Sequence, residues 1–143
     1  MDPSEQPLES VWGVVKLDYG YFNLVGDREA ADQTFQAPFD PQQVRSGSSL
    51  TVLAIAQTLR AKIVLSLWEQ EPVANGNGTF LGEGVLWSPD AEVSINSPTD
   101  TWGAIAVRLE EPGHYGIKVW RETVHQDDAE ERFDVRMWLR PSL

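Results

Sequence analysis

The chain contains no cysteine and only two histidines among its 143 residues. Without cysteine it can form neither a disulfide framework nor a thiolate metal site. A catalytic zinc site would have to recruit both His114 and His125 together with a carboxylate, and the two histidines lie eleven residues apart in a predicted turn and a predicted loop. We therefore expect no metal site and no cofactor.

Basic residues are also scarce, because 11 lysines and arginines stand against 22 acidic residues, which gives a formal net charge of −11. Such a charge repels nucleic acid and anionic membranes and attracts basic partners, although many acidic surfaces serve only solubility. No run approaches the roughly 18 apolar residues of a membrane span. The first ten residues lack the basic start and apolar stretch of a secretion signal. We expect a soluble cytoplasmic protein.

Recognisable catalytic motifs are missing as well. The chain has no Gly-x-Ser-x-Gly sequence, and its glycine-rich stretches at 75–78 and 82–84 lack the lysine of a phosphate-binding loop. With 22 carboxylates, some pair will lie at a suitable distance for glycoside hydrolysis by chance, so that pattern indicates nothing. We expect no catalytic residue and a function that is not enzymatic.

Short runs in which apolar and polar residues alternate fill most of the chain. Turn residues such as Asn75-Gly76-Asn77-Gly78 and Pro112-Gly113 separate them. The runs cover residues 12–18, 21–25, 50–57, 61–69, 79–87, 91–96, 102–109, 115–121 and 133–139. This spacing predicts an all-β fold, a single-domain antiparallel β-sandwich of about eight to nine strands over residues 11–143.

Three segments fall outside the predicted strands. Residues 1–10 are rich in proline, glutamate and serine and are predicted to form a flexible N-terminal tail. Residues 26–48 have no clear period and form a long connection. Residues 122–131 read as an acidic loop with room for a short helix. The brief link at 58–60 predicts a hairpin between the two runs that flank it.

Four of the six tryptophans occupy the polar face of their predicted strands. In the last run, Phe133, Val135 and Met137 share one face, whereas Trp138 lies on the other face among charged residues. The same reading applies to Trp68, Trp102 and Trp120. These rings either pack beneath a covering segment and over lysine and arginine stems, or they form a contact surface of the kind that aromatic hot spots build.

Three segments carry a resemblance to a known family. They are 16–22 (KLDYGYF), 59–68 (LRAKIVLSLW) and 106–120 (AVRLEEPGHYGIKVW). In order and spacing they resemble the competence protein J family, small inhibitors of the bacterial competence DNA-entry nuclease. The resemblance implies a small acidic bacterial β protein that binds and blocks a nuclease, and it assigns no functional residue.

The leading hypothesis is an acidic protein-binding module, an inhibitor or immunity protein that blocks a basic nuclease or toxin. Trp68, Trp120 and Trp138 are the predicted anchors. The predicted steering charges are Asp127, Asp128, Glu130 and Glu131. Two alternatives stand beside it: a carbohydrate-binding β-sandwich that stacks sugars on exposed tryptophans, and a homodimer that buries the tryptophan face.

Overall fold

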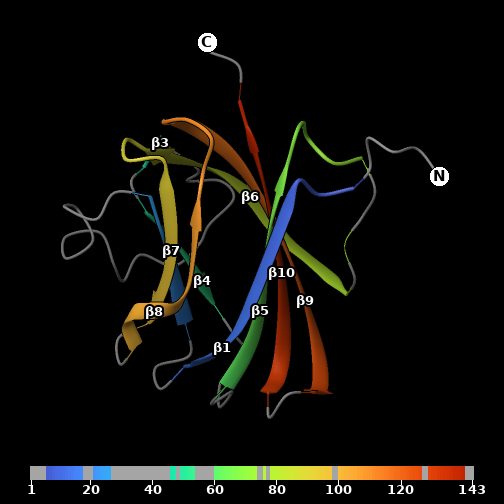
Figure 1. Cartoon of the computed structure of the whole chain (residues 1–143). Coiled ribbons are helices and arrows are strands. Elements are labelled where there is room, and N and C mark those ends of the chain that lie inside the picture. Colours follow the sequence, from blue (N-terminus) through green and yellow to red (C-terminus); the bar gives the residue numbers. More distant parts are fainter. Residues whose placement is uncertain are drawn as a thin grey trace.

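A computed structural model describes residues 6–17, 21–26, 46–47, 49–53, 60–73, 76, 78–97, 100–126 and 129–140. The described strands form two sheets that face each other (Figure 1). The six-stranded sheet has the order β1 (Glu9–Lys16), β5 (Arg60–Trp68), β10 (Ala129–Leu139), β9 (Gly113–Gln126), β6 (Thr79–Ser88) and β3 (Ser46–Gly47). The four-stranded sheet has the order β4 (Ser49–Leu53), β2 (Tyr21–Val25), β7 (Glu92–Ser97) and β8 (Asp100–Arg108).

The all-β prediction is confirmed, and the arrangement is sandwich-like, but the purely antiparallel prediction is wrong. The six-stranded sheet is mixed, because β10 pairs with β5 in parallel and β3 pairs with β6 in parallel. Ten strands lie in the described part of the chain, one or two more than predicted. The additional strand is the two-residue β3, which falls within the segment predicted as a long connection. The rest of that connection, apart from Gly26, lies outside the described residues.

The local predictions also need correction in three places. The hairpin across residues 58–60 does not form, because β4 and β5 belong to different sheets. The predicted acidic loop is largely strand, since β9 continues to Gln126 and β10 begins at Ala129. Residues 9 and 10 of the predicted tail belong to β1, and residues 1–5 lie outside the described residues. None of the described segments forms a helix with the length and hydrophobicity of a membrane span.

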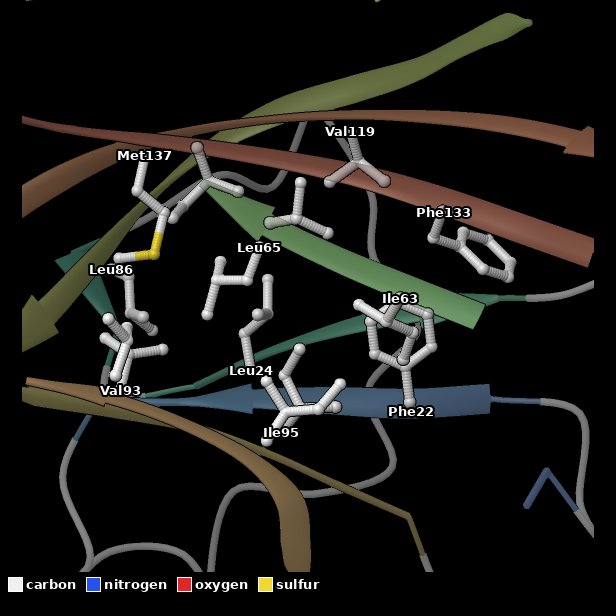
Figure 2. Packing of buried hydrophobic residues seen from close by; sticks show 14 of the residues in the cluster. Phe22, Leu24, Ile63, Leu65, Leu86, Val93, Ile95, Val119, Phe133 and Met137 are labelled. Carbon is white, nitrogen blue, oxygen red and sulfur yellow. The ribbon is translucent and has the colours of Figure 1, made fainter. Parts of the chain in front are cut away.

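The core lies between the two sheets and is built from the aliphatic faces of their strands. Figure 2 shows Phe22, Leu24 and Ile95 of the four-stranded sheet pointing toward side chains of the six-stranded sheet. Phe22 and Phe133 meet across the interface edge to face, with ring centroids 5.0 Å apart. Both rings are fully buried. Burial of these side chains is the main favourable term for folding, at roughly 2 kcal/mol for each large apolar group.

Tyr115 closes one end of the core. Its ring is buried near the start of β9, and its hydroxyl donates a hydrogen bond to the carbonyl oxygen of Glu111 at 2.7 Å. This bond ties the ring to the turn between β8 and β9. Desolvation raises the pKa of the Tyr115 phenol above its ordinary value of 10.0, because burial penalises the phenolate.

The raised pKa predicts a loss of stability in alkaline solution. Well below pH 10 the phenol is neutral in both the folded and the unfolded state, and its full contribution to the free energy of unfolding is present. As the pH rises through the pKa of the folded protein, the unfolded chain gives up this proton more readily and the native state is destabilised. Urea unfolding of Tyr115→Phe should show a shallower fall in stability between about pH 9 and 11 than the wild type. Identical pH slopes for the two proteins would contradict this assignment.

Candidate functional site

The six-stranded sheet turns a polar and aromatic surface away from the core, which we call the outer face. Strand pairing places its side chains in rows across the strands. One row runs through Trp12, Val64, Asp134, Trp120 and Phe80. The neighbouring row contains Ser66, Arg136, Lys118 and Glu83. The prediction that tryptophans lie opposite the aliphatic core is confirmed for β5, β9 and β10, whereas the Trp102 side chain lies outside the described residues.

Arg136 is the centre of the outer face. Its guanidinium carbon lies 5.1 Å from the ring centre of Trp68 and 4.9 Å from that of Trp120. One of its terminal nitrogens is 3.4 Å from a carboxylate oxygen of Asp134. A planar cation between aromatic rings is attracted by their electron-rich faces. The guanidinium therefore joins β5, β9 and β10 on the side away from the core.

Other cations on this face also lie over indole rings. The Lys62 ammonium is 4.4 Å from the ring centre of Trp12, and the Lys118 ammonium is 5.8 Å from that of Trp138. Trp68 is fixed further, because its indole N–H donates a hydrogen bond to the Ser66 hydroxyl at 2.8 Å. The sequence prediction that these tryptophans cover lysine and arginine stems thus describes the packing of the outer face.

The described residues between β5 and β6 (69–73, 76 and 78), here called the crossing segment, contact the outer face at two points. β10 and β9 separate these two strands in the sheet. Glu71 bonds Lys118 at 3.3 Å along this path. Gly76 lies directly against Trp120, since a β-carbon added there would approach the ring to 2.6 Å. The sequence predicts a cover formed by residues 26–48 or the tail, whereas the described cover comes from the segment after β5.

The three predicted anchors are nearly inaccessible to solvent. Trp68 and Trp138 are 8% exposed, and Trp120 is 4% exposed. They form the base of the outer face and do not project from it. The exposed rings are Trp12 on β1, at 56%, and Phe80 on β6, at 49%. Sequence reasoning overlooked both, although Phe80 follows the turn at 75–78 and begins the alternation of its strand.

A shallow hollow of about 450 Å³ opens beside the exposed ring of Phe80. The ring centres of Phe80 and Trp120 are 5.2 Å apart and form part of its wall. Its lining residues are Gly76, Gly78, Phe80, Glu83, Lys118 and Trp120. In the described part of the chain no group of three or more histidines and carboxylates could hold a metal ion.

Of the four predicted steering charges, the structure describes Glu130 and Glu131, and neither lies beside the tryptophans. Asp127 and Asp128 lie outside the described residues. Glu130 is exposed, but the parallel register places it beside the start of β5, at the other end of the strands from Trp68 and Trp138. Glu131 is 1% exposed and lies 3.4 Å from Arg121, so it cannot present its charge to a partner. The sequence alone does not show that Glu131 is buried, because Glu130 and Glu131 are adjacent acidic residues. Successive side chains of β10 point to opposite faces of the sheet, so one is exposed and the other is buried.

Exposed charge in the described residues is predominantly negative. The exposed basic side chains are Lys16, Arg60 and Arg108. The exposed acidic side chains are Glu9, Glu69, Glu71, Glu83, Asp90, Glu110, Glu111 and Glu130. The remaining lysines and arginines of the described part are partly buried, and three of them lie over indole rings. Folding therefore concentrates negative charge at the surface beyond what composition alone requires.

The architecture and this outer face define a small two-sheet β-sandwich protein with an acidic surface. Two solved structures share its fold. One is ComJ from Bacillus subtilis, an inhibitor of the DNA degrading activity of NucA, with a TM-score of 0.57 and 13% identity over 94% of this chain and 98% of that chain. The other is the product of crocagin biosynthetic gene J, with a TM-score of 0.63 and 11% identity over 93% and 98%. No family model and no curated protein sequence matches this chain.

The resemblance identified in the sequence is therefore confirmed at the level of the fold. The identity to either neighbour is too low to transfer a residue or an activity.

The packing of Arg136 predicts a measurable loss of stability when its charge is removed. Arg136→Met keeps much of the side-chain length but leaves Asp134, which is buried, without this guanidinium. We expect the free energy of unfolding to fall by about 1–3 kcal/mol in urea titrations followed by circular dichroism. Arg108→Met removes the same charge from an exposed position on β8. This control should change the free energy of unfolding by less than about 0.5 kcal/mol. Equal losses for both variants would refute the role of Arg136.

Proposed function

We propose that this protein binds a nuclease and inhibits it. The observation that carries the proposal is the charge of the folded surface, where exposed carboxylates outnumber exposed cations in the described residues. A nuclease holds its substrate through basic groups that neutralise phosphates. An acidic protein that occupies those groups competes with DNA for them. The fold shared with ComJ, itself an inhibitor of DNA degradation, supports this choice among acidic binding proteins.

The acidic side chains supply attraction over a distance. Glu69 and Glu110 line one small hollow beside Tyr115, and Glu111 follows directly in the chain. These three carboxylates lie near the ends of β5 and β8, beside the covered tryptophans. Glu130 adds an exposed carboxylate at the other end of the sheet. Opposite charges on two partners accelerate their encounter and align them before contact.

The tryptophans have a supporting role in this proposal. Trp68, Trp120 and Trp138 hold the outer face rigid, and a rigid surface loses little conformational entropy when it binds. Their burial weighs against the carbohydrate-binding alternative, because sugars stack on rings that solvent can reach. It also weighs against a homodimer built on these three rings, since the segment after β5 already contacts Trp120.

The direct test starts from the native host. The tagged protein should retain a partner from the host extract, and that partner should degrade DNA when released. Adding one equivalent of this protein should stop the degradation. As a control, an extract first saturated with untagged protein should yield no captured nuclease. A recovered partner without nuclease activity, or one that remains active in excess inhibitor, would refute the proposal.

Salt and charge variants test the electrostatic part of the proposal. The association rate constant should fall by about tenfold or more between about 0.05 and 0.5 M salt, as measured by stopped-flow fluorescence. A triple variant with Glu69, Glu110 and Glu111 changed to glutamine should associate more slowly than wild type at low salt. A control with Lys16, Arg60 and Arg108 changed to glutamine should associate as fast or faster. Association that is insensitive to salt and to both triple changes would rule out electrostatic steering.

A further inference from the structure

The hollow beside Phe80 differs from the centre of the outer face because one of its two aromatic rings, that of Phe80, is open to solvent. Phe80 is about half exposed, and its ring is tilted by 54° against that of Trp120. Gly76 and Gly78 form the opposing rim. Gly78 has a φ of +91°, a conformation that favours glycine, and neither of these two glycines adds a side chain to the hollow.

The charges around the hollow favour a cation. Glu83 is exposed and stands opposite Lys118 in the pairing of β6 with β9, yet it has no ion-pair partner in the described part of the chain. Lys118 lines the same hollow, but its ammonium lies 3.3 Å from Glu71. Glu71, which lies outside the lining, neutralises the ammonium of Lys118, so the charge of Glu83 is the one in the lining left without an ion pair. The nearby Asp134 already contacts Arg136. A positively charged group entering the hollow would meet one carboxylate without a competing partner.

The same face already shows which cation suits such a setting. Arg136 combines two aromatic rings and one carboxylate, and Trp120 is one of the two rings. The hollow offers the same three elements in Phe80, Trp120 and Glu83. A guanidinium is planar, stacks on aromatic rings and bonds carboxylates through a fork of N–H groups. An ammonium provides only a point charge, and a neutral sugar leaves the carboxylate without a counter-charge.

We propose that this hollow receives an arginine side chain of the basic partner. The inference rests on the proposed function for the identity of the partner, whereas the chemistry of the hollow follows from its own lining. A nuclease surface rich in arginine offers such side chains where it holds phosphates. The arginine would stack against Phe80 and donate hydrogen bonds to Glu83.

Two conservative variants test the hollow in the inhibitor assay. Phe80→Leu keeps an apolar side chain but removes the aromatic ring, and Glu83→Gln keeps the shape but removes the charge. Each should weaken binding to the recovered nuclease by about tenfold or more. Asp90→Asn removes one exposed charge beyond the other end of β6 and serves as the control. This variant should change the affinity for the nuclease by less than about twofold. Wild-type inhibition by both hollow variants would overturn this proposal and leave the inhibitor function standing.

A second measurement does not need the nuclease. A short peptide containing two arginines should shift the indole N–H signal of Trp120 in NMR spectra of the whole protein, and the matching peptide with neutral citrulline should not. Glu83→Gln should abolish the shift. Because the titration uses no nuclease, it tests whether the hollow binds arginine even if this protein inhibits no nuclease. Equal shifts with arginine and citrulline, or no shift with either, would refute an arginine site.

Discussion

The outer face depends on one interaction, the guanidinium of Arg136 held between Trp68 and Trp120 and against Asp134. A charged group this far from water is costly unless rings and a counter-charge surround it. The rings come from β5 and β9, and the carboxylate comes from β10, so the interaction joins three adjacent strands. It also withdraws a cation from the surface. The packing of the aromatic residues therefore adds to the acidity that the composition already gives the exterior.

Topology adds a second constraint. Because β5 and β10 are parallel and β9 follows beside β10, the chain must cross two strands before it begins β6. The crossing segment meets the outer face at Lys118 through Glu71 and at Trp120 through Gly76. The ring of Phe80 stays half exposed at the border of the face. The proposed recognition site accordingly lies at the edge of the aromatic layer.

Alternation along the strands was sufficient to predict the fold class and the side on which Trp68, Trp120 and Trp138 lie. It could not predict which strands are neighbours, because the pairing of β5 with β10 joins residues about seventy positions apart. The burial of Glu131 depends on Arg121 in a neighbouring strand, so no local pattern shows it. The exposure of Phe80 depends equally on where the crossing segment passes. Local sequence determines the faces, and long-range pairing determines what covers them.

Hydrogen exchange at the indole N–H groups tests the central claim most directly. The claim is that Trp68, Trp120 and Trp138 are closed off from solvent while negative charge faces it. The Trp68 indole is 8% exposed and bonded to Ser66, whereas the Trp12 indole is 56% exposed. In the native protein the Trp68 N–H should exchange with deuterated water far more slowly than that of Trp12. Equal exchange rates for the two groups would mean that the outer face is open to water, which would contradict the claim.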